Sequence, residues 1–330
     1  MSGESLAKKI IATLNQKSEK AIDTAKQLIL EDKFTEEKIN QTIEQYTSRW
    51  NDSTRPGTLA LAFEAVGGKP DGAVPLQTAL VLIDATMDIH DDIIDGSTAK
   101  KNVKTVFGRL GKEAALLLGD AFMVKGFSQL NKATEKMPKE RKQLIVDAAQ
   151  SFLHEVVDAH ITEAQLKAKK WNVSPETYLQ VLTRKAADID GRMKIGAIYG
   201  GGSPKEVQVL SRLGRNLGVL LVIRAEYIDM FETDELSNRV KNECLPLPLL
   251  YAIQNKTAKG KIKKSLLKEK ITQDDCNSVI EILDNTKEAQ ELKEYLTKIA
   301  SEIKKLTESI KGIQARNDLN NLAASLLESL

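Results

Sequence analysis

The sequence predicts an all-α protein, and three observations support that class. Proline is scarce, with 8 residues in 330, and none lies between Pro75 and Pro138 or after Pro248. No segment shows sustained alternation of apolar and polar residues, and no Asn-Gly or Asp-Gly pair joins two β-branched runs. Signals for the start of a helix, in contrast, recur along the chain.

Local signals place the starts of several helices. A capping serine followed by proline at the first helical position occurs twice, and in the second case a glutamate completes a capping box. Threonine followed by acidic residues marks the other starts. Three consecutive glycines separate two helices, and no GK[ST] follows them, so they do not indicate a phosphate loop. In chain order the segments are Thr35-Glu36-Glu37, Ser174-Pro175-Glu176, Gly200-Gly201-Gly202, Ser203-Pro204-Lys205-Glu206 and Thr272-Gln273-Asp274-Asp275.

Composition predicts one folded domain that covers residues 1–330. Hydrophobic residues make up 42% of the chain, which allows a large core, and we find no linker, repeat or low-complexity tract. Charged residues make up 28%, yet the formal net charge is only +2. That balance argues against a nucleic-acid-binding protein and against a disordered chain. We therefore expect no nucleic-acid partner.

The sequence predicts a cytoplasmic protein without a membrane span. Cys244 and Cys276 make no disulfide framework and no CxxC pair, which is typical of a reducing compartment. The N-terminal segment contains no apolar core of a signal peptide. The longest uncharged apolar stretch, residues 72–83, is far shorter than the roughly 20 residues that a membrane span needs.

A run of aspartates stands in an apolar segment that has no nearby cation. On a helix, residues spaced by three, four and seven share one face, so the last four of these aspartates form one stripe. Like charges at this spacing repel, and the penalty grows if the face is partly buried without a cation. Local stability therefore gives no reason for the stripe. The aspartates are Asp84, Asp88, Asp91, Asp92 and Asp95, and no Lys or Arg lies between Lys69 and Lys100.

A hard divalent cation would explain the stripe. Mg²⁺ takes oxygen ligands and is commonly shared between a few carboxylates and a substrate phosphate. Asp91 and Asp95 lie one turn apart and could hold such ions together. The alternative is a solvated acidic face, but the preceding segment, VPLQTALVLIDATM, is too apolar to border plain solvent.

Basic residues follow the stripe at once. Carboxylate-held Mg²⁺ opposite ammonium and guanidinium groups is the arrangement that a diphosphate needs. The alternative is that these residues only make a loop soluble. They are Lys100, Lys101, Lys104, Arg109 and Lys112.

At these residues the sequence resembles the trans-polyprenyl diphosphate synthases, which include the farnesyl and geranylgeranyl diphosphate synthases. The match starts with a DDxxD motif, Asp91-Asp92-Ile93-Ile94-Asp95, preceded by His90 and followed by Ser97. It continues through Lys100-Lys101, Thr105-Val106, Phe107-Gly108 and Gly119-Asp120 in the family's order and spacing. Weaker agreement covers most of the chain, at Arg55-Pro56, Lys185, Leu217-Gly218 through Asp229, and Leu247-Pro248-Leu249.

The resemblance implies an isoprenoid synthase fold, a helical bundle around a central cavity with two acidic motifs facing each other across it. It implies Mg²⁺ as the cofactor and an allylic prenyl diphosphate as the substrate. The family ionises this substrate to a carbocation, which isopentenyl diphosphate attacks before a proton is lost. Because the family is usually dimeric, a homodimer or a heterodimer with a paralogue is implied.

The family pattern breaks at two places. The family's lysine in GGKxxRP falls on Asp52, and a histidine before the DDxxD falls on Asp84. Both family residues help to bind isopentenyl diphosphate, whereas a carboxylate repels it. The second acidic motif begins with Ala225, which has no side-chain oxygen, and a later lysine falls on Cys244. Whether Glu226 or Asp229 replaces the missing ligand is open at this point.

Three interpretations of the function follow, and the first is our prediction. The chain is an isoprenyl diphosphate synthase-type prenyltransferase that condenses an allylic diphosphate with isopentenyl diphosphate. Alternatively, it ionises the allylic diphosphate without condensation, as terpene cyclases and diphosphate lyases do. In the third interpretation it is a non-catalytic or regulatory subunit that pairs with an active relative.

The resemblance also assigns roles to individual residues. Asp91, Asp95 and Lys185 would be catalytic, and Asp91, Asp92, Asp95 and Asp229 would hold Mg²⁺. Lys100 with Lys185 would contact the allylic diphosphate, and Arg55 with Lys101 would hold isopentenyl diphosphate.

Overall fold

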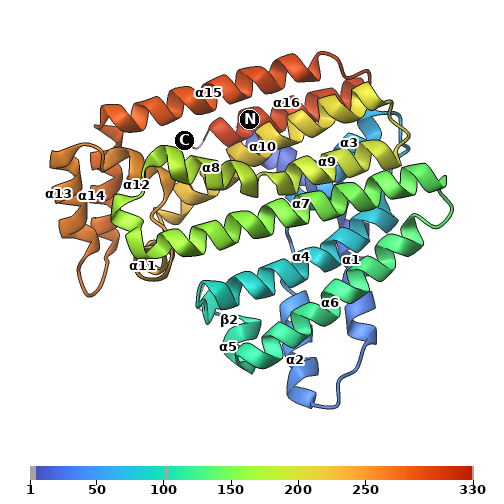
Figure 1. Ribbon diagram of the computed structural model, residues 1–330, viewed down its shortest axis with the longest axis horizontal. Coiled ribbons are helices and arrows are strands. Elements are labelled where there is room, and N and C mark those ends of the chain that lie inside the picture. The colour runs from blue at the N-terminus through green and yellow to red at the C-terminus, as the bar shows by residue number, and fades with distance from the viewer. Residues whose placement is uncertain (1–4, 101–102, 329–330) are drawn as a thin grey trace. The chain divides into compact units, whose positions relative to one another are not determined.

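The computed structural model describes residues 5–100 and 103–328, and these residues are mostly helical (Figure 1). The all-α prediction is confirmed. The strands found in the described ranges are β1 (Ala99–Lys100) and β2 (Val103–Lys104), an antiparallel pair. Strands of two residues are too short to produce the alternation that reveals a strand in a sequence. None of the described helices is both long and apolar enough to cross a membrane.

The chain divides into two compact units. Unit 1 runs to Ala149 and also takes in Arg192–Leu210 and Ile310–Asp318. Unit 2 comprises Gln150–Gly191, Ser211–Ser309 and the segment from Leu319 onward. The expectation of a single domain over residues 1–330 stays a prediction.

The elements before the first unit boundary are long helices joined by short connections. In unit 1, α4 lies beside α6 and also packs against α1 and α3 (Figure 1). The helices are α1 (Leu6–Glu31), α2 (Glu37–Thr47), α3 (Thr54–Ala65), α4 (Val74–Ile94), α5 (Val106–Leu110) and α6 (Lys112–Ala133).

The remaining helices continue the all-α pattern, and the unit boundaries fall inside four of them. Within unit 2, α12 packs against α8, α14 and α15, and α13 packs on α14. The elements are α7 (Lys139–Leu166), the 3₁₀ helix η1 (Lys167–Asn172), α8 (Pro175–Lys185), α9 (Ala187–Tyr199), α10 (Pro204–Asp229), α11 (Thr233–Asn242), α12 (Leu247–Ala252), α13 (Lys256–Leu266), α14 (Gln273–Asp284), α15 (Lys287–Thr307) and α16 (Ile313–Leu327).

The helix starts predicted from local signals are confirmed. The Ser174 hydroxyl accepts a hydrogen bond from the Thr177 N–H where α8 begins. At the start of α10, the Glu206 carboxylate accepts one from the Ser203 N–H at 2.9 Å. Thr272 forms a full capping box with the third residue of α14, whereas α2 begins at Glu37 without a side-chain cap. These caps satisfy N–H groups that have no partner within their helix.

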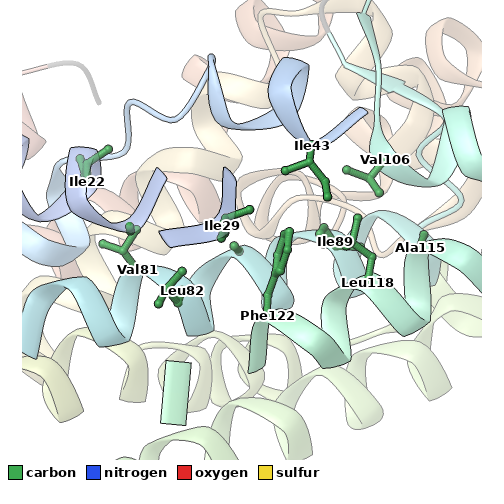
Figure 2. Packing of buried hydrophobic residues seen from close by; sticks show 12 residues of the cluster. Ile22, Ile29, Ile43, Val81, Leu82, Ile89, Val106, Ala115, Leu118 and Phe122 are labelled. Carbon is green, nitrogen blue, oxygen red and sulfur yellow. The ribbon is translucent and has the colours of Figure 1, made fainter. Parts of the chain in front are cut away.

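An apolar cluster in unit 1 fixes the position of α4. Figure 2 shows side chains from α1, α2, α4, α5 and α6 converging in it. Leu82 and Ile89 from α4 are completely buried there, and Phe122 from α6 is 3% exposed. Burying side chains of this size stabilises the fold by about 1.5–3 kcal/mol each. One face of α4 is thus packed into the core as far as its last turn.

The end of α4 is a tight reversal at the predicted DDxxD motif. The Ser97 N–H bonds to the Asp92 carbonyl at 2.8 Å, and the Gly96 N–H bonds to the Ile93 carbonyl at 3.3 Å. This is the Schellman pattern, which needs a residue of left-handed conformation, and Gly96 has φ +67°. Glycine adopts that conformation without steric cost. The helix therefore ends at Ile94 with Asp95 as its C-cap, and the chain turns into the β1–β2 pair.

The segment after β2 is held against the reversal. The Thr105 hydroxyl donates to the Ser97 carbonyl at 2.7 Å, and its oxygen caps α5 through the Gly108 N–H. A Cβ atom on Gly108 would lie 1.9 Å from the Thr98 carbonyl oxygen. Glycine is thus required for this close approach, which explains why a Phe-Gly pair follows the motif.

Unit 1 contains a buried ion pair at a position where the family pattern breaks. Arg192 from α9 is 1% exposed and is the largest fully buried side chain of the described residues. Its guanidinium pairs with the carboxylate of Asp84, whose side chain is 13% exposed. An arginine stays charged in proteins, so its burial requires a nearby anion. Asp84 therefore has a structural role in this unit.

We expect Asp84→Ala to lower the free energy of unfolding by about 3–5 kcal/mol, because the buried guanidinium loses this carboxylate. Chemical denaturation followed by circular dichroism measures the change. Asp88→Ala is the control, since the Asp88 side chain is 50% exposed and its loss should change stability by about 1 kcal/mol or less. Equal effects of the two variants would contradict the structural role of Asp84.

Candidate functional site

The first group of candidate site residues lies in unit 1, at the end of α4. Asp92 faces inward, and its carboxylate lies 2.7 Å from the Lys100 ammonium on β1. Burial raises the pKa of Asp92 to about 6, although the ion pair with Lys100 opposes the shift. The carboxylates nearby raise the pKa of Lys100 in turn. The reversal at Gly96 thus brings a cation back onto the middle of the motif.

Asp91 and Asp95 are the outer carboxylates of the same motif. Asp91 lies in the last turn of α4, Asp95 caps the helix, and both are partly exposed. Two carboxylates one turn apart fit Mg²⁺, which keeps waters and completes its shell with substrate phosphates. Among the described residues, no three carboxylate, imidazole or thiol side chains are gathered as a complete metal cage. A pair of carboxylates is the kind of donor set that Mg²⁺ shares with a substrate.

A second cation of unit 1 is engaged by two carboxylates. The Arg55 guanidinium, on α3, lies 3.3 Å from Asp52 and 3.3 Å from Asp88 on α4. The Arg55 side chain is 33% exposed, so part of it faces solvent. Asp52 is where the family has a lysine. Asp52 and Asp88 thus offset the positive charge of Arg55, which a diphosphate would otherwise meet.

The second group of candidate site residues lies in unit 2. It includes Lys185, the last residue of α8. Its ammonium is 2.5 Å from the Glu163 carboxylate, and both side chains are largely buried. Burial alone would raise the pKa of Glu163, but the charges of Lys185 and Arg239 lower it to about 2. Glu163 is therefore ionised at neutral pH and holds Lys185 in place.

The end of α10 carries the degraded second acidic motif, and a cation from α11 meets it. The Arg239 guanidinium bonds to Asp229 through Nε at 3.1 Å and through one terminal nitrogen at 2.9 Å. The same nitrogen is 3.2 Å from Glu226, and the other terminal nitrogen is 3.4 Å from Glu243. Arg239 thus contacts three carboxylates.

Glu226 is buried and both of its oxygens have partners. One oxygen accepts from the Leu247 N–H at 2.7 Å, and the other lies 2.7 Å from the Tyr178 hydroxyl. That hydroxyl is also 2.6 Å from Glu163, yet it carries one proton for the two carboxyl groups. A proton on Glu226 would satisfy both contacts, and burial raises the pKa of Glu226 despite the charge of Arg239.

The second motif offers few oxygens to a metal ion in this arrangement. Ala225, at its leading position, is exposed and offers no oxygen. The oxygens of Glu226 are used within the protein, and Asp229 is paired with Arg239. The sequence-based assignment of Asp229 as a Mg²⁺ ligand stays a prediction.

The predicted site residues divide between the two units. The structure brings Asp92 together with Lys100, and Arg55 together with Asp88. Lys185 lies in unit 2. Lys101 lies outside the described residues. The roles assigned to all of these residues stay predictions.

Sequence analysis missed the buried partners. Arg192, Glu163, Tyr178 and Arg239 form the ion pairs and hydrogen bonds described above, and no local motif marks them. Arg239 follows Asp229 by ten residues, and Tyr178 precedes Glu226 by 48. The signal that could have found them is the need of each buried carboxylate for a cation. It could not have chosen among the chain's 48 Lys and Arg residues.

Relatives of known name align with part of the chain. A short chain isoprenyl diphosphate synthase of Methanothermobacter thermautotrophicus is 30% identical over 205 residues, which is 61% of this chain and 61% of that protein. A geranylgeranyl diphosphate synthase of Methanosarcina mazei is 28% identical over 192 residues, 58% of each. The matched region therefore spans about three fifths of these relatives.

Solved structures share the fold over nearly the whole chain. A geranylgeranyl pyrophosphate synthetase from Pyrococcus horikoshii superposes with a TM-score of 0.83 at 22% identity, covering 97% of this chain and 98% of that one. A polyprenyl synthase from Caulobacter crescentus, solved with calcium and isoprenyl diphosphate, gives 0.78 at 18% identity, with 97% and 98% covered. These likenesses confirm the predicted isoprenoid synthase fold.

The family model described as polyprenyl synthetase matches residues 36–283, three quarters of the chain. That range contains the DDxxD motif on α4, the degraded second motif on α10 and the Leu247-Pro248-Leu249 segment. The resemblance read from the motifs is confirmed, and the chain belongs to the polyprenyl synthetase family.

Proposed function

We propose that this protein is an isoprenyl diphosphate synthase that acts on allylic prenyl diphosphates in isoprenoid biosynthesis. The observation that carries the proposal is the end of α4, where Asp91 and Asp95 flank a buried Asp92 that is paired with Lys100. The names of the relatives, isoprenyl and geranylgeranyl diphosphate synthases, support the same activity.

The reaction breaks the bond between the allylic carbon and the diphosphate oxygen. The electron pair leaves with the diphosphate, so negative charge grows on its oxygens while a carbocation forms. The double bond of isopentenyl diphosphate then attacks the cation, and loss of a proton restores a neutral product tail. Charges placed around the departing diphosphate lower this barrier because they stabilise the charge as it develops.

The residues of this chain take the following roles in the proposal. Asp91 and Asp95 hold Mg²⁺, which would neutralise the departing diphosphate. Asp92 keeps Lys100 beside the motif, and the Lys100 side chain is 51% exposed, which allows it to reach a ligand. Lys185 would contact an allylic diphosphate, as the family resemblance implies, and Glu163 orients the Lys185 side chain.

The isopentenyl diphosphate site is proposed around Arg55. Lys101 would assist there, as the family resemblance implies. The Asp52 and Asp88 carboxylates compete with a diphosphate for the Arg55 guanidinium, since each lies 3.3 Å from it. We therefore expect weak binding of the second substrate.

We further propose that the protein works as a dimer in the cytoplasm, with an identical chain or a paralogue as its partner. Exposed apolar side chains on α6 support an interface: Leu117 is 68% exposed and Val124, seven residues later, is 71% exposed. Leu116 and Phe127 are 43% and 42% exposed on the same helix. The free thiols of Cys244 and Cys276 support a reducing compartment.

The first test incubates the purified protein with Mg²⁺, geranyl or farnesyl diphosphate, and isopentenyl diphosphate. We expect elongated products, and we expect Asp95→Asn to lower kcat by about 100- to 1,000-fold because it weakens the hold on the metal. Chromatography of the products and an assay of released diphosphate are the measurements. The control is Glu113→Gln, an exposed carboxylate in the first turn of α6.

Other outcomes of that test would replace the proposal. Release of diphosphate without elongation would identify a cyclase or lyase. No turnover by the protein alone, with activity appearing or changing once a homologue is added, would identify a regulatory subunit.

A second prediction concerns the carboxylates around Arg55. The double variant Asp52→Asn/Asp88→Asn should lower KM for isopentenyl diphosphate by about three- to tenfold, because two partly exposed carboxylates no longer compete for the guanidinium. Steady-state kinetics at saturating allylic substrate measure it. Asp71→Asn is the matched control, since Asp71 pairs with Lys20 elsewhere in unit 1. An unchanged or raised KM would show that Arg55 does not bind the second substrate.

A further inference from the structure

We propose that Arg239 takes the position of a metal ion at the second acidic motif, so that the metal ions of the reaction are held by the first motif alone. The inference deepens the proposed function and rests on it for the identity of the diphosphate substrate. It differs from the sequence-based assignment, in which Asp229 binds Mg²⁺.

The geometry at Asp229 is that of a strong ion pair. Two nitrogens of the Arg239 guanidinium, Nε and one terminal nitrogen, lie within 3.1 Å of the same carboxylate oxygen. Charge-assisted hydrogen bonds of this kind are roughly twice as strong as neutral ones. A divalent ion at the other oxygen of Asp229 would lie beside the guanidinium charge and be repelled by it.

Glu226, the other carboxylate of the motif, is poorly accessible to a metal ion. The side chain of Glu226 is 3% exposed, and its two oxygens are taken by the Leu247 N–H, by the Tyr178 hydroxyl and by Arg239. An ion could reach this carboxyl group only by entering the protein interior beside the Arg239 guanidinium, which would repel it. Since Ala225 has no side-chain oxygen, no residue of the motif replaces it.

Arg239 itself is held from several sides. Its side chain is 11% exposed, and it is within 3.4 Å of Glu243 and of the Tyr178 hydroxyl in addition to the two motif carboxylates. The charge of a guanidinium cannot be removed by deprotonation in a protein. If it swung out to admit a metal ion, it would give up its hydrogen bonds to Asp229 and its contacts with Glu226 and Glu243. The Arg239 side chain is therefore held in a fixed position within unit 2.

The presence of Arg239 in place of a metal ion also agrees with the charges of the motif. A carboxylate motif in the family serves to hold dications that face the diphosphate, whereas here the same carboxylates neutralise a side chain. Unit 2 then holds two cations of its own, Lys185 and Arg239, each of which is already paired with carboxylates. The expected consequence is a smaller number of metal ions per chain.

The test counts Mn²⁺ bound per chain in the presence of inorganic pyrophosphate, by electron paramagnetic resonance of the free ion. We expect Asp229→Asn to leave the count unchanged, as does the exposed control Asp234→Asn on α11. Arg239→Gln should gain about one Mn²⁺, because Asp229 is then available as an oxygen ligand, and the double variant Arg239→Gln/Asp229→Asn should lose this ion again. Circular dichroism verifies that each variant is folded.

A drop in the Mn²⁺ count caused by Asp229→Asn alone, in a folded protein, would overturn the inference. This single variant decides the question even if Arg239→Gln does not fold. Asp95→Asn reports on the proposed function separately: it should lower the count by about one ion or more. If Asp95→Asn has no effect, the metal site of the proposed function fails, whatever the result at Asp229.

Discussion

Carboxylates in apolar surroundings need cations, and this constraint organises both units of the protein. Removing an ion from water costs several kcal/mol, and only a well-placed opposite charge with further hydrogen bonds offsets it. In unit 1, Asp84 is matched by Arg192 and Asp92 by Lys100. In unit 2, Lys185 and Arg239 match Glu163, Glu226 and Asp229. The positions of the charged residues in the candidate site follow from these pairs.

The backbone at the end of α4 is what makes the pairing in unit 1 possible. The left-handed Gly96 stops the helix, and the Ser97 N–H bonds back to the Asp92 carbonyl. Lys100 returns by way of this turn to the carboxylate of Asp92. Helix packing against α6 supports the same end from the other side, because Ile89 is completely buried. The fold of unit 1 and the candidate metal site therefore depend on the same short segment.

The two acidic motifs have diverged to different degrees from the family pattern. The first keeps its three aspartates, and its carboxylates suit an ion that is shared with a diphosphate. The second has lost an oxygen at Ala225 and has gained an internal guanidinium. Membership in the polyprenyl synthetase family and the loss of individual family residues are compatible, because the fold depends on buried apolar helices rather than on the motif carboxylates.

Local chemistry along the chain was sufficient for the helix starts and for the first motif. Caps such as Ser174 and Thr272 act on N–H groups two or three residues away, so the sequence shows them directly. The same holds for the spacing of Asp91 and Asp95, since one helical turn separates them. The β1–β2 pair was not predictable, because two residues per strand show no period.

The partners of the buried carboxylates were decided only by tertiary structure. Arg192 is 108 residues from Asp84, and Tyr178 is 48 residues from Glu226. A sequence shows that a carboxylate in an apolar segment needs a cation, but not which distant side chain supplies it. That choice depends on how the helices pack, and packing is a property of the folded chain as a whole.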